Sequence, residues 1–176
     1  MRRIPIMVAA LVVAATATVA FAAVTIKSLP TATFSGASVT VSGGNLSGLG
    51  NDPATGELTS TGQATYTCHN GGKKGTTVPG QNPVPAQSGD SGPFDLGNSQ
   101  HNGRGTIQNI TATVTAPGPT PSAQDVGCGG NGATNWTVTL DSLTALTAHL
   151  EVYQDGNLIF CRNYTLGEAD ATGTAC

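Results

Sequence analysis

The sequence predicts an all-β fold, in the form of a single disulfide-braced β-sandwich domain. Three observations lead to this expectation. The chain has 176 residues with 24 glycines and only 10% charged residues, so the long polar side chains that favour helix surfaces are scarce. Several segments alternate apolar and polar residues with a period of two, as half-buried strands do. Four cysteines in an exported chain indicate two disulfides.

The N-terminus has the pattern of an export signal. Arg2-Arg3 precedes the apolar run IPIMVAALVVAATATVAFA, which ends in the small-x-small pattern Ala20-Phe21-Ala22. We expect a signal peptide of residues 1–22 and a secreted, extracellular domain of residues 23–176 without a membrane span. An uncleaved N-terminal anchor is the alternative, because apolar residues continue beyond Ala22.

Charge limits the partners of the mature chain. Removal of the expected signal peptide would take away two of the seven basic residues. The mature chain would then have five basic and ten acidic residues. Nucleic acids and anionic membranes are bound by clustered Lys and Arg, and the mature chain has a single small cluster, Lys73-Lys74, between glycines. We therefore expect no nucleic-acid partner, and an extracellular protein or glycan remains as the class of partner.

Period-two alternation is clearest in residues 58–68. The opposite face of this segment is wholly polar, which predicts a half-buried strand. Its core face consists of Leu58, Ser60, Gly62, Ala64, Tyr66 and Cys68. Similar but weaker patterns predict strands in 38–49, with a break at Gly43-Gly44, and in 106–115, 136–140 and 146–154.

The strongest local signal is a β-hairpin near the C-terminus. The strand expected at 146–154 is followed by Asp155-Gly156-Asn157 and then by the apolar run LIFCRNY. Two proline-rich segments, 69–104 and 116–134, remain as loops, because proline lacks the N–H that a strand ladder needs. Long loops in compact domains are often functional, so we expect loop 69–104 to be the contact surface.

The cysteines permit three pairings. We favour Cys68 with Cys128 and Cys161 with Cys176, since the second bond ties the last residue to a strand and prevents fraying. A zinc site needs close pairs such as Cys-x-x-Cys, and none occurs. The sequence therefore predicts structural disulfides and no metal or other cofactor.

Two resemblances add to this interpretation. The segment GQATYTC, residues 62–68, resembles the Tyr-x-Cys signature of immunoglobulin domains, which implies an immunoglobulin-like sandwich. ATYTC, PGQN, LGNSQHNGRG and the terminal cysteine together resemble a group of small secreted actinobacterial proteins. That second resemblance implies a bacterial, extracellular protein and no particular activity.

Enzyme chemistry is weakly supported. Ser91 in SGDSGP resembles the nucleophile turn of chymotrypsin-like serine proteases, but the second glycine of that motif is missing and His69 follows its cysteine instead of preceding it. A turn explains the segment, so we expect no enzyme. His69 and His101 with Asp90 or Asp95 form the metal-site alternative, without a closely spaced pair of ligands. His149 is expected to share a strand face with Glu151 and Tyr153 and to point to solvent.

The densest polar cluster lies in LGNSQHNGRG. It predicts a recognition loop in which amides and a guanidinium bind a sugar or peptide and Phe94 supplies the only aromatic platform. Its candidate residues are Phe94, Asp95, Asn98, His101, Asn102 and Arg104. A structural alternative is a tight turn at Asn102-Gly103 with Arg104 bridging Asp95.

Two functions follow as hypotheses. The first is a secreted non-enzymatic protein that binds a ligand or covers a surface at the cell exterior, with the ligand left open. The alternative is a disulfide-braced inhibitor of an extracellular protease, which would present Lys73-Lys74 to a trypsin-like enzyme.

Overall fold

A computed structural model describes residues 24–50, 52–72, 75–96, 103–129 and 135–176. Within these ranges the regular structure is β strand and no helix occurs, so the all-β class is confirmed. The expected signal peptide, Lys73-Lys74, and the loop residues Asn98, Gln100, His101 and Asn102 lie outside the described residues. In the described part of the chain, no helix has the length and apolar character needed to cross a membrane.

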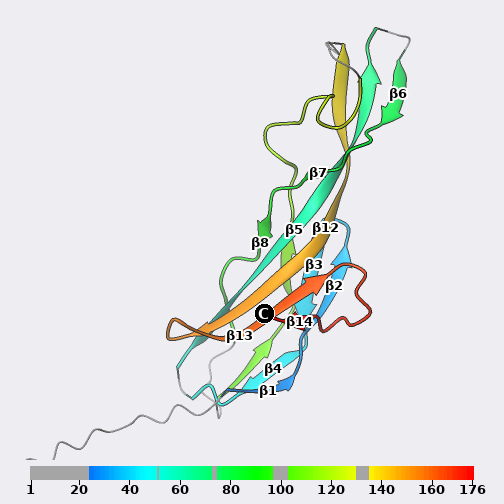
Figure 1. Ribbon diagram of the computed structural model, residues 1–176. Helices are drawn as coiled ribbons and strands as arrows, with labels where there is room; N and C mark the ends of the chain where they lie inside the picture. The colour runs from blue at the N-terminus through cyan, green and yellow to red at the C-terminus, as the bar shows by residue number, and fades with distance from the viewer. Residues whose placement is uncertain (1–23, 51, 73–74, 97–102, 130–134) are drawn as a thin grey trace, which may run out of the picture.

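Two long strands form the axis of the molecule. β5 (Ala54–Asn70) and β12 (Trp136–Gln154) pair antiparallel along their whole lengths, and Figure 1 shows them as a twisted ribbon that runs from one end of the body to the other. β12 is two residues longer than β5, and register shifts at Asp141 and Leu146 absorb the difference. Segments 136–140 and 146–154, expected as separate strands, are therefore one continuous strand with two bulges.

The predicted hairpin is confirmed. β13 (Asn157–Thr165) returns antiparallel to β12, with Gln154 opposite Asn157. Asp155 and Gly156 between them both have positive φ, 49° and 75°, as a two-residue type I′ turn requires. The other edge of β13 pairs with β14 (Thr174–Ala175), near the C-terminus.

The edge of β5 opposite β12 is covered by four short strands in succession. They are β6 (Thr76–Pro79), β7 (Val84–Pro85), β8 (Gly89–Asp90) and β9 (Phe94–Asp95). Prolines interrupt this segment repeatedly, and because proline has no N–H to donate, the ladder is broken into short pieces. The expectation that 69–104 is one long loop is therefore corrected: much of its described part is an edge strand broken into pieces too short to show alternation.

Two three-stranded sheets follow one another and form a second layer, called here the three-stranded layer, beside this large sheet. One half consists of β1 (Thr25–Ser28), β4 (Gly44–Ser47) and β10 (Arg104–Ile107), and the other of β2 (Thr31–Ser35), β3 (Ser38–Ser42) and β11 (Ile110–Thr113). The register of β10 on β4 continues without a shift into β11 on β3. Gly43, with φ of 84°, makes the break expected in the middle strand.

Two apolar clusters stabilise the body. The larger lies between the three-stranded layer and the sheet of β5, β12 and β13, with Val39, Val41 and Ile107 from the layer and Leu58 and Leu150 from the sheet. The second cluster surrounds the far half of β5 and contains Ala64, Tyr66, Cys68, Val126 and Cys128. Apart from Gly62, which is partly exposed, the residues predicted to share the core face of 58–68 are all buried.

Candidate functional site

The described residues of the predicted recognition loop do not form a single site. The Phe94 ring covers Gly56, where an added Cβ would lie 2.3 Å from the ring carbon Cζ, and it packs against the larger apolar cluster. Phe94 is therefore partly buried core and not an open aromatic platform. Asp95 pairs with Thr55 at the edge of the large sheet, whereas Arg104 lies in the three-stranded layer. The Asp95–Arg104 ion pair does not form; among described residues the only ion pair joins His149 to Glu151.

Arg104 lines a hollow on the outer face of β1, β4 and β10. This surface, the cationic hollow, has a volume of about 520 Å³. Besides Leu46 and Gly105, it is lined by the polar and basic residues Lys27, Ser28, Asn45, Ser47, Arg104 and Thr106. Hydrogen bonds fix its floor: the Thr106 hydroxyl donates to Asn45 Oδ1 (3.0 Å), and Asn45 Nδ2 donates to the Ser28 hydroxyl (2.8 Å). The hollow thus has a polar floor whose side chains are held by one another.

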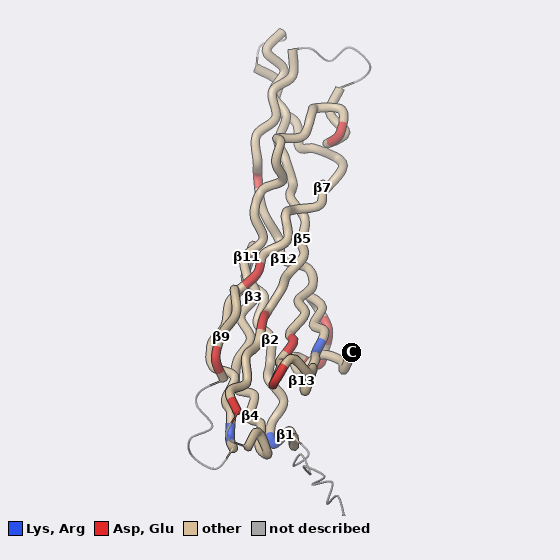
Figure 2. The backbone as a smooth tube through the Cα atoms, turned by 90° about the vertical axis from the view of Figure 1, so that its left-hand side faces the viewer, with Lys and Arg blue, Asp and Glu red and all other residues tan. Residues whose placement is uncertain are grey.

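The charge at this end of the molecule is unusual for the chain. Figure 2 shows two blue positions near β1 and β4 at the same end of the tube. Lys27 and Arg104 are two of the three Lys and Arg residues in the described part, and neither forms an ion pair with another described residue. Among the described residues that line the hollow, none is acidic. In a protein with net charge −3, this surface is the described site best suited to an anion.

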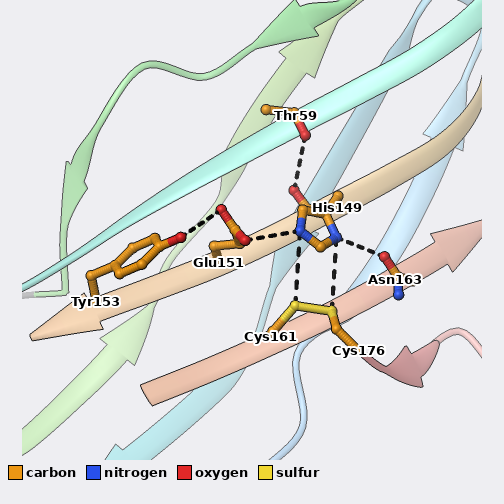
Figure 3. The surroundings of a disulfide bond; sticks show 7 residues. All are labelled: Thr59, His149, Glu151, Tyr153, Cys161, Asn163 and Cys176. Atoms are coloured by element: carbon orange, nitrogen blue, oxygen red, sulfur yellow. Dashed lines mark hydrogen bonds and ion pairs between the residues drawn. A yellow bond between two sulfur atoms is a disulfide. The ribbon is translucent and has the colours of Figure 1, made fainter. Parts of the chain in front are cut away.

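A second polar cluster surrounds the Cys161–Cys176 disulfide (Figure 3). His149 on β12 lies opposite Asn163 on β13, and Glu151 lies opposite Cys161. The ring nitrogens of His149 face two oxygen acceptors: Nδ1 is 2.6 Å from Asn163 Oδ1, and Nε2 is 3.2 Å from Glu151 Oε1. Because an imidazole nitrogen must carry a hydrogen to bond an oxygen acceptor, this arrangement favours the doubly protonated imidazolium.

The imidazole ring also contacts the disulfide. Its Nε2 lies 3.8 Å from Cys161 Sγ, and its Nδ1 lies 3.8 Å from Cys176 Sγ. His149 does share a face with Glu151 and Tyr153, and the Tyr153 hydroxyl donates to Glu151 (3.0 Å). The expectation that His149 simply points to solvent is corrected, because its side chain, 38% exposed, covers one side of the sulfur bridge.

The pKa of His149 gives the cluster a pH dependence. Burial lowers this pKa, but hydrogen bonds to Asn163 and Glu151 and the charge of Glu151 outweigh burial, so the pKa lies above the ordinary histidine value. The protonated ring therefore stabilises the fold fully below about pH 6.5, the value in the unfolded chain, and this stabilisation is lost as the pH rises through the folded pKa.

We expect the free energy of unfolding to decrease above about pH 6.5 in the wild type and to lose that step in His149→Gln. Urea unfolding over a pH series measures the step, and an NMR titration of the ring protons gives the pKa directly. Glu151→Gln removes the neighbouring charge and should lower the pKa of His149. A His149 pKa at or below that of free histidine would contradict the assignment.

The metal-site alternative is not supported by the described residues. His69 bonds Thr77 (2.9 Å) near one end of β5, whereas Asp95 pairs with Thr55 near the other end. At about 3.3 Å per strand residue, these positions are roughly 46 Å apart. His149, Cys161 and Cys176 have atoms close enough to share an ion, but the two sulfurs are bonded to each other as a disulfide. The remaining candidate, His101, lies outside the described residues.

Ser91 has a structural role. Its Oγ accepts a hydrogen bond from the Leu58 N–H (3.1 Å) and donates one to the Gly92 carbonyl (2.7 Å). Asp90 accepts from the Gly92 N–H, and Gly92 has a positive φ of 65°. The GDSGP segment is thus a turn that attaches the chain to the edge of β5.

The two disulfides join Cys68 to Cys128 and Cys161 to Cys176, the pairing favoured from the sequence. Comparisons of the chain with protein-family models, curated proteins and solved structures find no match. The class that fold and sites define is an all-β, disulfide-bonded protein. Lys27 was not predicted as a site residue, although it is one of only five basic residues that follow the expected signal peptide.

Proposed function

We propose that the mature chain is a secreted, non-enzymatic β-sandwich protein of immunoglobulin-like type that binds an anionic carbohydrate at the cell exterior. The cationic hollow is the binding site. The observation that carries this proposal is the placement of Lys27 and Arg104 around one polar, acid-free surface. A carboxylate on the carbohydrate accepts hydrogen bonds from the Arg104 guanidinium and the Lys27 ammonium.

The size and lining of the hollow support a carbohydrate. Small-molecule sites have volumes of about 300–1,000 Å³, a range that includes this hollow. Ser28, Ser47 and Thr106 offer hydroxyl oxygens that can accept hydrogen bonds from sugar hydroxyls. Two cations are too few for the extended phosphate contacts that nucleic acids need, so the ligand is a short stretch of acidic sugar.

Export and the sandwich are supported by independent features. Both disulfides lie in the expected mature domain, and disulfides persist in oxidising compartments rather than in the cytosol. The sandwich is supported by the three-stranded layer, which packs across an apolar cluster from the large sheet. Tyr66 and Cys68, which suggest the immunoglobulin-like type, are both buried in the second cluster. The protease-inhibitor alternative rests on Lys73-Lys74, outside the described residues, and no described contact favours it.

Binding to polygalacturonate, a carboxylated polysaccharide, tests the site. We expect calorimetric titration of residues 23–176 at low salt to detect binding to polygalacturonate and none to neutral dextran. Lys27→Ala/Arg104→Ala should weaken the affinity about a hundredfold or more, since hydrogen bonds to charged groups contribute about 1.5–3 kcal/mol each.

A matched control separates the site from general charge effects. Lys73→Ala/Lys74→Ala removes the same number of charges elsewhere in the chain and should retain wild-type affinity. Equal losses in the two double variants would show that binding depends only on net charge. Absence of binding by the wild type would overturn the proposed ligand class.

A further inference from the structure

We propose that the Cys161–Cys176 disulfide is a thiol-exchange site, at which a small-molecule thiol forms a mixed disulfide with Cys176. The inference rests on a contrast between the two disulfides of this chain. Cys68 and Cys128 are 0% and 3% exposed and lie inside an apolar cluster. Cys161 is partly buried, Cys176 is exposed, and a histidine ring lies against both of their sulfurs.

Access determines which sulfur is attacked. A thiolate has to approach one sulfur along the line of the sulfur–sulfur bond, with the other sulfur as the leaving group. Cys176 belongs to an exposed segment that is tied to the sheet by the two-residue strand β14, whereas Cys161 lies within β13 between paired neighbours. Attack on Cys176 Sγ therefore leaves the Cys161 sulfur as the departing thiolate.

His149 stabilises that departing thiolate. Its Nε2 lies 3.8 Å from Cys161 Sγ, and the ring is held there by the Asn163 and Glu151 acceptors, which favour the imidazolium (Figure 3). A cation beside a cysteine lowers the pKa of its thiol, and a thiol of lower pKa leaves faster. The Cys68–Cys128 bond is instead buried among apolar side chains such as Tyr66 and Val126, which offer no cation to a departing thiolate.

The other charged groups around His149 do not cancel this effect. Glu151 lies on the same strand, and Glu57 on β5 lies opposite Glu151. Glu151 favours the protonated ring, and Glu57 adds no positive charge to this face. Arg162 on β13 lies opposite Leu150, whose side chain is fully buried, so Arg162 is on the core side of the sheet and not on the face of the disulfide.

The exchange step balances without an external oxidant. The incoming thiolate sulfur forms a bond to Cys176 Sγ as the bond between Cys176 Sγ and Cys161 Sγ breaks. The electron pair of that bond goes to Cys161, which becomes a thiolate beside the His149 imidazolium. The thiol has already lost its proton to solvent, and the number of disulfide bonds is unchanged. The C-terminal segment then remains attached through β14 and through the hydrogen bond from the Ala32 N–H to the Ala171 carbonyl.

Reaction of residues 23–176 with glutathione tests the site. Samples are quenched with iodoacetamide at intervals and digested for mass spectrometry. We expect glutathione on Cys176 and carbamidomethyl on Cys161 to appear well before any label on Cys68 or Cys128. His149→Gln should slow the reaction about threefold or more, as expected for a leaving group whose pKa rises by about one unit. His69→Gln, the matched change at a histidine far from this disulfide, should react at the wild-type rate.

Three outcomes would overturn the proposal: equal reactivity of the two disulfides, glutathione on Cys161 instead of Cys176, or a wild-type rate in His149→Gln. Circular dichroism tests whether the His149→Gln variant is folded. If the variant is unfolded, the rate of the wild-type reaction, expressed per glutathione thiolate, is measured against pH instead. That rate should fall as His149 loses its proton, and a flat profile would equally contradict the proposal, since a merely structural histidine leaves the rate independent of its charge.

Discussion

Joint replacement of Cys68 and Cys128 by alanine is expected to lower the free energy of unfolding by about 4 kcal/mol. The bond closes a loop between positions 60 residues apart, and the entropy that such a cross-link removes from the unfolded chain corresponds to about that amount. Both sulfurs are also buried in the second apolar cluster, so alanine adds a small loss of packing. Urea unfolding followed by the fluorescence of Trp136, which packs against this cluster, measures the effect.

The second disulfide provides the control. Cys161 and Cys176 are separated by only 15 residues, which corresponds to about 3 kcal/mol or less, and Cys176 is exposed near the chain end. The alanine pair at these positions should therefore be the more stable variant. A larger loss from the terminal pair than from Cys68 and Cys128 would show that loop entropy does not dominate.

Leu150→Ala is expected to cost about 2–5 kcal/mol of unfolding free energy. Leu150 on β12 lies directly opposite Leu58 on β5, and both side chains are 0% exposed in the larger apolar cluster. Truncation leaves a cavity that the surrounding strands, paired on both sides, cannot readily close. Urea unfolding followed by far-ultraviolet circular dichroism measures the loss.

Leu158→Ala on the same hairpin is the matched change. Leu158 is 50% exposed, so its truncation should change the free energy of unfolding by less than about 0.5 kcal/mol. Similar losses at positions 150 and 158 would mean that the cluster between the two layers is not the main source of stability.

The parts of the fold that could be predicted from the sequence are those that depend on short local patterns. The core face from Leu58 to Cys68 and the Asp155-Gly156 hairpin follow from alternation and turn chemistry within about ten residues. Strands β6 to β9 could not be predicted, because their pairing with β5 depends on distant partners and each is too short to alternate. The continuity of β12 was hidden by the bulges at Asp141 and Leu146, where the alternation changes phase.

The cluster around His149 shows how far local patterns reach. That His149, Glu151 and Tyr153 share a face follows from spacing alone. The turn pairs Gln154 with Asn157, and an unbroken register from there would place Arg162 opposite His149. A register shift between the Tyr153–Leu158 pair and the Val152–Phe160 pair places Asn163 there instead. The one extra residue in β13 therefore places the Asn163 acceptor opposite His149 in place of the Arg162 cation. No pattern in the sequence predicts this bulge.

The cationic hollow depends on pairing over a longer range. Lys27 and Arg104 lie far apart in the chain and come together because β4 pairs with β1 on one side and with β10 on the other. Arg104 was predicted to act together with the other candidate residues between Phe94 and Arg104. Of the described members of that set, only Arg104 lines the cationic hollow.

The short strands along β5 have a consequence for solubility. A strand of 17 residues with an open edge would offer its N–H and C=O groups as a template on which another copy could add, the first step toward fibrous self-association. In this protein that edge is occupied by a segment rich in proline and glycine, which cannot itself extend the ladder outward without interruption. The longest strand pair of the molecule is thereby protected from edge-to-edge association with other copies of the chain.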